Sequence, residues 1–118
     1  MTVRSPSSIG SKPDQLIARI WHGVTEAARA DDYAEYLGRT GVRDCRATAG
    51  NRGVFVLRRA LGDRVEFTFI SLWESVDAIR RFAGDDYEKA RYYDEDRDFL
   101  VELEPLVDHY DVVAAVSQ

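Results

Sequence analysis

Residues 65–75, VEFTFISLWES, decide the predicted fold. Their alternation predicts a β-strand that ends at Trp73, because successive side chains on a strand point to opposite faces. One face then carries Val65, Phe67, Phe69, Ser71 and Trp73. Ile70 and Leu72 make the opposite face partly apolar as well, so we expect both faces to be covered near Trp73. Ser75 is a favourable N-cap for a helix that begins directly after this strand.

The flanking sequence adds three strands and a second helix. β-Branched and aromatic residues predict strands at 16–24, 54–59 and 106–113. Helical spacing of apolar residues predicts a helix that ends at Gly38 or Gly41, and a loop at 45–53. The order strand, helix, strand, strand, helix, strand is that of the ferredoxin-like βαββαβ fold. This is an α+β fold, in which helices cover one face of an antiparallel sheet.

Length and charge limit the classes of protein that this chain can represent. Its 118 residues suit one domain, which we place at 16–113, between a disordered N-terminal tail at 1–15 and a C-terminal tail at 114–118. With 16 basic and 21 acidic residues the formal charge is 16 − 21 = −5, which argues against nucleic acid or an anionic membrane as a partner. The single cysteine, Cys45, excludes an internal disulfide, and we expect a cytoplasmic protein.

One layer of helices covers only one face of the predicted sheet. The other face carries Ile70 and Leu72, so it needs a partner or contact with water. Packing of this face against the same face of a second copy would bury it. The sequence therefore predicts a homodimer.

Four stretches of the chain resemble antibiotic biosynthesis monooxygenase (ABM) domains, which are dimeric α+β barrels. They are residues 16–24, 50–57, 70–75 and 107–113, and the tryptophan that closes the third strand is the most specific element. The resemblance implies a cavity between sheet and helices for an aromatic polyketide, a quinol or haem. It also implies chemistry with molecular oxygen that often needs no metal or organic cofactor.

Two departures from the family pattern refine that expectation. Haem-degrading relatives carry a ligand histidine about ten positions after the strand-ending tryptophan, whereas residues 81–84 of this chain read RFAG. We therefore expect neither haem degradation nor a cofactor. The loop before the second strand has Ala49-Gly50 in place of Pro-Gly, which changes the rigidity of the turn more than the chemistry.

His109 and Trp73 are the candidate catalytic residues. Oxygenation without a cofactor needs a base, a donor for the developing oxyanion and an aromatic wall. Pairing the strands end to end places Trp73 near Leu16 and His109 near Ile20, more than about 10 Å apart. The pair can flank an elongated cavity but cannot touch one atom, which favours a large, flat substrate. The side chains that either contact this ligand or belong to the core are Phe67, Phe69, Phe82, Tyr93 and Phe99.

Three other residues have uses that the sequence leaves open. Arg19 lies in mid-strand and needs an acceptor, either across the dimer or on Glu66 or Asp108, unless it binds an anion. Asn51 suits a left-handed turn position. Cys45 has no histidine beside it in the sequence and carries no predicted role.

The leading functional hypothesis is a cofactor-independent monooxygenase, an oxidoreductase that acts on a flat aromatic or quinol-like substrate. The alternative is a non-catalytic dimeric module of the same fold that binds a small hydrophobic molecule or serves in stress. A third hypothesis, haem or flavin binding, predicts a coloured protein. A cavity beneath the helices favours the enzyme, and solid packing there favours the alternative.

Overall fold

The computed structural model describes Ile9 and residues 15–116. Its centre is a five-stranded antiparallel sheet in the order β2-β3-β1-β4, with β5 also paired to β1. The strands are β1 (Ile17–Glu26), β2 (Asn51–Leu61), β3 (Arg64–Trp73), β4 (Leu100–Leu103) and β5 (Asp108–Asp111). The predicted α+β architecture, with the first strand between the third and the closing strand, is confirmed.

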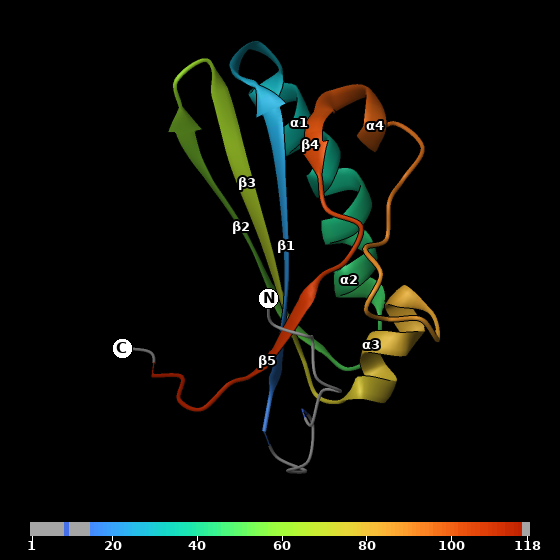
Figure 1. Cartoon of the computed structure of the whole chain (residues 1–118). Helices are drawn as coiled ribbons and strands as arrows, with labels where there is room; N and C mark the ends of the chain where they lie inside the picture. The colour runs from blue at the N-terminus through green and yellow to red at the C-terminus, as the bar shows by residue number, and fades with distance from the viewer. Residues whose placement is uncertain (1–8, 10–14, 117–118) are drawn as a thin grey trace, which may run out of the picture.

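All the helices lie on one face of the sheet, as predicted (Figure 1). A continuous helical segment follows β1, and a helix and a single helical turn lie between β3 and β4. They are η1 (Ala27–Arg29), α1 (Ala30–Leu37), η2 (Gly38–Val42), α2 (Arg43–Ala47), α3 (Val76–Ala83) and α4 (Asp96–Phe99). The Ser75 hydroxyl accepts a hydrogen bond from the Ala78 N–H at 3.1 Å, which confirms the predicted N-cap.

The strand register agrees with the prediction to within one residue. Trp73 lies opposite Ile17, and His109 lies opposite Arg19. The closing edge differs, because two short strands, β4 and β5, replace the single strand predicted at 106–113. Pro105 lies between them and has no N–H to donate to the ladder, so the pairing with β1 is interrupted there.

The predicted end of the first helix is wrong. Gly38 keeps right-handed helical angles, and the chain continues through the π-helical turn η2 into α2, so Cys45 lies in a helix rather than a loop. Gly41 packs closely against Phe69, since an added Cβ would lie 3.3 Å from the Phe69 ring. Tertiary contact therefore overrides the weak helix propensity of glycine.

The turn before β2 also differs from the prediction. The positive φ of this turn, +95°, is at Gly50 and not at Asn51. In the described part of the chain, every residue with a positive φ is a glycine. Asn51 is extended at the start of β2, and its side chain bridges Gly53 and the Leu72 carbonyl at a β-bulge.

Gly50 and Gly62 form a matched pair for a stability measurement. A Cβ on Gly50 would lie 2.4 Å from the Ala78 Cβ, whereas a Cβ on Gly62, at φ +63°, would meet nothing within 4 Å. Gly62→Ala should lower the free energy of unfolding by about 1 kcal/mol through backbone strain alone. Gly50→Ala adds overpacking and should cost about 2–4 kcal/mol. Urea denaturation of both variants measures the difference, and equal losses would contradict the close approach of α3 to this turn.

Two clusters of buried side chains form the core between the sheet and the helices. One gathers around Tyr33 and Phe67, and the other around Trp73 and Ile79. Phe69 is only partly buried and packs against both clusters. The interior therefore has a junction at Phe69, between two separately packed regions.

The other face of the sheet carries an apolar row that no helix or strand of the described residues covers. Phe55, Ile70 and Ile20 are direct cross-strand neighbours on β2, β3 and β1, and Phe55 is 55% exposed. In the next rows Leu57 and Tyr110 are exposed as well. Exposed apolar patches of this kind mark interaction surfaces.

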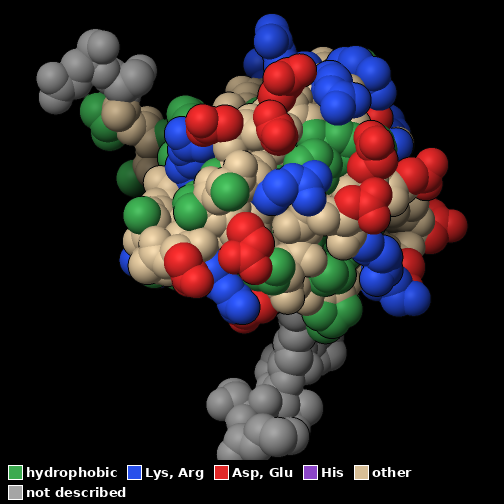
Figure 2. Space-filling view, turned by 90° about the horizontal axis from the view of Figure 1, so that it is seen from above, with side chains coloured by type: hydrophobic (Ala, Val, Ile, Leu, Met, Phe, Trp, Pro, Cys, Tyr) green, Lys and Arg blue, Asp and Glu red, His purple; other side chains and the backbone are tan. Residues whose placement is uncertain are grey.

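Charged side chains of both signs are mixed at the end of the molecule. Figure 2 looks onto the end that is uppermost in Figure 1 and shows acidic side chains interspersed among the basic ones. Within residues 15–116, no helix has the length and apolar character that crossing a membrane requires.

Candidate functional site

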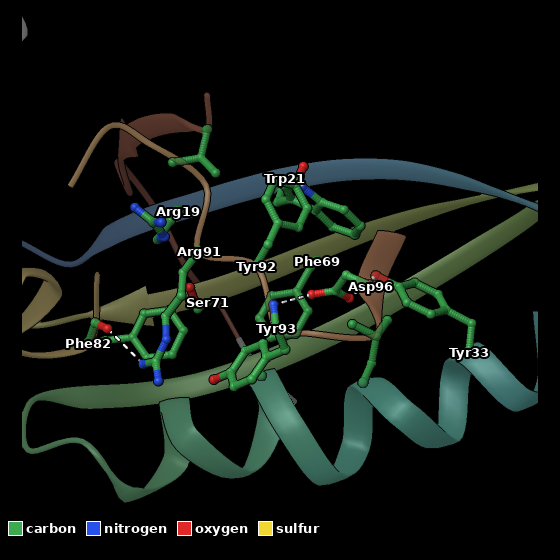
Figure 3. A pocket seen from close by; sticks show the side chains of 13 residues that line it. Arg19, Trp21, Tyr33, Phe69, Ser71, Phe82, Arg91, Tyr92, Tyr93 and Asp96 are labelled. Carbon is green, nitrogen blue, oxygen red and sulfur yellow. Dashed lines mark hydrogen bonds between the residues drawn. The ribbon is translucent and has the colours of Figure 1, made fainter. Parts of the chain in front are cut away.

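A cavity opens at the junction between the two core clusters. It lies between the inner face of β1 and β3, the helices α1 to α3, and the irregular chain before α4 (Figure 3). The space inside it that is open to water-sized molecules is about 50 Å³, and all the empty space, with the open mouth included, is about 500 Å³. The lining residues are Arg19, Trp21, Tyr33, Leu37, Gly41, Phe69, Ser71, Phe82, Arg91, Tyr92, Tyr93, Asp96 and Val107.

Aromatic side chains form most of the wall. Trp21 and Phe69 are cross-strand neighbours on the inner face of the sheet. The Trp21 Nε1–H donates to the Tyr92 hydroxyl at 2.8 Å, and the two rings meet edge to face at 6.0 Å. The polar atoms of these two residues therefore bond to each other. Their rings remain available for stacking on a flat guest.

A buried cation lies at one end of the cavity. Arg19 is 5% exposed, and its guanidinium donates to the Tyr87 carbonyl, to the Lys89 carbonyl at 3.0 Å and to His109 Nε2 at 3.2 Å. None of the acceptors predicted from the sequence is among these partners. Burial lowers the pKa of Arg19 to about 10, so it stays protonated at neutral pH.

The contact with Arg19 fixes the state of His109. A guanidinium has no acceptor, so Nε2 must accept and the remaining proton of a neutral ring must lie on Nδ1. The ring also packs edge to face on Tyr87, with the centroids 5.3 Å apart. His109 thus points to the helix-covered face and holds Arg19.

A buried carboxylate lies at the other end. Asp96 is 3% exposed, accepts from the Tyr33 hydroxyl at 2.9 Å, and accepts from the Tyr93 N–H at 2.6 Å. Burial raises the pKa of this carboxyl group. Burial, together with the adjacent Asp96, also raises the pKa of Tyr33, so this phenol stays a donor.

The two charged ends are well separated. Tyr33 packs on Phe67, which lies opposite Gly23, four residues along β1 from Arg19. At about 3.3 Å per residue, the two ends are roughly 13 Å apart along the strand. Figure 3 shows Arg19 and Asp96 on either side of Phe69. The cavity is therefore an elongated aromatic slot with a cation at one end and an acid at the other.

The raised pKa of Asp96 has a measurable effect on stability. The folded state holds this proton more tightly than the unfolded chain, whose aspartates titrate near 3.8, so unfolding releases protons above that pH. The free energy of unfolding of the wild type should therefore fall, relative to Asp96→Asn, as the pH rises from about 4 through the folded-state pKa. Urea denaturation at several pH values from 4 to 7 tests this, and a constant difference between the two proteins would contradict it.

The chain between α3 and α4 covers the mouth of the cavity through side-chain contacts. The Tyr93 hydroxyl donates to Asp44 Oδ2 at 2.6 Å, the Tyr92 hydroxyl donates to the Glu104 carbonyl, and Arg91 donates to the Phe82 carbonyl at 2.8 Å. The start of this segment is also held by its backbone, because the Ala90 N–H donates to the Pro105 carbonyl and the Val107 N–H donates to the Glu88 carbonyl, each at 2.9 Å. Residues 91–95 are irregular, so this part of the cover can move without breaking a strand or helix.

The structure brings some of the predicted site residues to the cavity. Phe69, Phe82 and Tyr93 line it, whereas Phe67 and Phe99 pack on Tyr33 within the core. His109 and Trp73 are not among the described residues that line it. His109 lies behind Arg19.

Trp73 lies directly behind the cavity wall. It is fully buried, packs on Phe82 with ring centroids 5.7 Å apart, and its Nε1–H donates to the Ser71 hydroxyl at 2.8 Å. Ser71 and Phe82 both line the cavity, so Trp73 positions two lining residues.

Cys45 is buried near the Arg19 end of the cavity, and burial raises the pKa of its thiol to about 12. The thiol is therefore neutral and unreactive. Within the described part of the chain, no three His, Cys, Asp or Glu side chains are grouped as a metal would require.

These elements define an α+β protein whose antiparallel sheet and helices enclose an aromatic cavity. No family model matches the sequence, and comparison with curated proteins gives no match. Solved structures do share the fold. A candidate antibiotic biosynthesis monooxygenase from Bacillus cereus aligns with 88% of this chain and 99% of its own, at 16% identity and a TM-score of 0.58.

Two further structures are similar over nearly their whole length. A monooxygenase from the ActVA-Orf6 gene of Streptomyces coelicolor, in complex with the ligand nanaomycin D, aligns with 94% of this chain and 99% of its own, at 20% identity and a TM-score of 0.55. A protein of unknown function from Nitrosomonas europaea aligns with 91% and 98%, at 14% identity and a TM-score of 0.59. The resemblance to ABM domains is thus confirmed at the level of the fold.

Proposed function

We propose that the cavity binds a flat aromatic molecule and catalyses its oxidation by molecular oxygen without a cofactor. The observation that carries this proposal is the slot itself, with aromatic walls and a buried charged group at each end. The Streptomyces coelicolor monooxygenase of the same fold, which was solved with nanaomycin D, supports the class of ligand. A quinol or an anthrone-like ring system, flat and hydroxylated, fits these features.

Asp96 is our candidate proton acceptor. It faces the cavity, and its raised pKa brings it towards the range in which a carboxylate is an effective base at neutral pH. His109, the base predicted from the sequence, accepts from Arg19 through Nε2 and is one residue removed from the cavity. We therefore give His109 a positioning role.

The proposed reaction balances without an added reductant. For an anthrone-like substrate, Asp96 takes a proton from the ring CH₂ group, and the carbanion formed donates its electrons to O₂. The new C–O bond carries a hydroperoxide, which loses water as the second C–H proton departs. The CH₂ group becomes a carbonyl, one oxygen atom stays in the product, and the other leaves as water. The substrate supplies all four electrons that reduce O₂.

Oxygen uptake by metal-free protein tests this function. Anthrone-like and hydroquinone substrates should consume oxygen faster with the protein than without it. With an anthrone-like substrate, ¹⁸O₂ should place one labelled atom in the new carbonyl group of the product. Tight binding of these molecules with no oxygen uptake would instead support a non-catalytic binding module. If these molecules neither bind nor react, both functions are excluded for this class of ligand.

The uncovered sheet face supports a homodimer as the working unit. Pairing of two such faces buries the row formed by Phe55, Ile70 and Ile20, which a single chain leaves in contact with water. We therefore propose that the protein is a dimer with one cavity in each protomer.

A further inference from the structure

Arg19 has donor capacity that the protein itself does not use. A guanidinium carries five N–H groups. The hydrogen bonds of Arg19 to Tyr87, Lys89 and His109 use three of them, two on Nη1 and one on Nη2. Within the described part of the chain, the Nε–H and the second Nη2–H remain for a ligand. Arg19 lines the cavity, so a guest can reach this group.

The partners of Arg19 do not neutralise its charge. Two are backbone carbonyls and the third is an imidazole nitrogen, so each offers only a partial negative charge. A buried cation is costly unless an anion pairs with it. The site therefore favours an incoming negative charge.

Two further groups at this end carry no charge. Ser71, the cross-strand neighbour of Arg19, is neutral, and Cys45 keeps its proton because its thiol is buried. Arg91 also lines the cavity, where its guanidinium pairs with Asp44 at 3.5 Å. The acidic residue of the lining, Asp96, is at the opposite end of the slot. Aromatic walls that lead to a cation suit a planar anion.

We propose that the cavity selects flat aromatic anions, whose ionised oxygen, a phenolate or a carboxylate, lies against Arg19. This inference rests on the proposed function and specifies the substrate class. The guanidinium fork can donate to such an oxygen through two parallel N–H groups. An ionised ring oxygen also makes the ring electron-rich, which is the form that reacts with O₂.

Matched pairs of ligands test the charge preference by binding alone. The first pair is 2-naphthoate with 2-naphthylmethanol, and the second is 4-hydroxycoumarin, ionised at pH 7.5, with coumarin. Each pair keeps the ring system and differs in the charged oxygen. Calorimetric titration or quenching of tryptophan fluorescence gives the dissociation constants in the absence of turnover. The wild type should bind each anion about 10- to 100-fold more tightly than its neutral partner.

Three variants show whether Arg19 causes that preference. Arg19→Gln should bring the two members of a pair to within about threefold, while the affinity for the neutral ligand changes little. Arg19→Lys keeps the charge without the fork and should give an intermediate preference. Arg39→Gln removes one positive charge from an exposed position outside the cavity lining and should behave as the wild type. Circular dichroism verifies that each variant is folded.

The outcomes separate this inference from the function on which it rests. Preference for anions in the wild type that is lost in Arg19→Gln supports the inference, and the better-bound pair identifies phenolate or carboxylate. If Arg19→Gln does not fold, loss of part of the preference in Arg19→Lys is the supporting result. Equal binding of charged and neutral partners by the wild type overturns the inference and leaves an aromatic cavity intact. Failure of all four ligands to bind overturns the proposed function as well.

Discussion

Phe55→Asp should convert the protein from a dimer to a monomer. Phe55 lies on the edge strand β2, in the apolar row of the uncovered sheet face beside Ile70, and is 55% exposed in the single chain. In a face-to-face dimer an aspartate there would be buried without a partner, which costs about 3–5 kcal/mol for each copy. Two copies raise the dimer dissociation constant by more than about 10⁴-fold. Analytical ultracentrifugation of the wild type and the variant over a range of concentrations measures this change.

Leu61→Asp is the control for the added charge. Leu61 is 45% exposed on the same strand and the same face, but it lies at the end of β2, opposite Arg64 and outside the apolar row. This variant should remain dimeric. A wild type that sediments as a monomer, or a Phe55→Asp variant that remains a dimer, would show that this face is not the interface.

Asp96→Asn should abolish most of the oxidation while the cavity still binds aromatic ligands. The amide cannot take a proton from the substrate, and removal of a general base typically lowers the rate by about 10²–10⁴-fold. The side chain keeps its size, and its carbonyl can still accept from the Tyr33 hydroxyl. The expected signature is therefore a loss in kcat with little change in ligand affinity. Oxygen uptake and calorimetric titration on the same preparation measure both quantities.

His109→Gln is the comparison that separates the two candidate bases. Glutamine can still accept a hydrogen bond from Arg19. If His109 only positions the guanidinium, His109→Gln should therefore lower the rate of oxidation by about tenfold or less. If His109→Gln loses the activity and Asp96→Asn retains it, the prediction from the sequence is right and our assignment of Asp96 is wrong.

Most of the fold could be predicted from local patterns. The alternation along 65–73, Ser75 after it and the order of elements were sufficient to place Trp73 opposite the start of β1 and His109 within one residue of its partner Arg19. The sequence left open which face of the sheet His109 occupies. The errors occurred where tertiary contacts decide. Gly41 remains helical because Phe69 packs against it, a contact that no local pattern reveals.

The candidate site was only partly predictable. Aromatic residues at inward-facing strand positions, such as Phe69, are identifiable from alternation. Asp96 lies in the run DEDRD at 94–98, in which one carboxylate is buried and its neighbours are exposed. Its burial depends on Tyr33, which is 63 positions away in the sequence. No local signal distinguishes this carboxylate from a solvated one.

The energetic cost of the buried charges at the two ends of the cavity favours a functional explanation for them over a structural one. Lowering the pKa of Arg19 from 12.5 to about 10 corresponds to about 3 kcal/mol against the charged form. Burial similarly disfavours the charge of Asp96. An apolar pair of similar volume would avoid both penalties. Charges that the fold does not need are expected where a ligand or a reaction uses them.

The most direct test of the central claim is a crystal structure of the protein grown without oxygen in the presence of 1,4-dihydroxynaphthalene. We expect electron density for the ring within the cavity, against Phe69 and between Trp21 and Tyr93, with one oxygen towards Arg19. An empty cavity at saturating ligand, or a ring bound only at the outer face of the sheet, would contradict it.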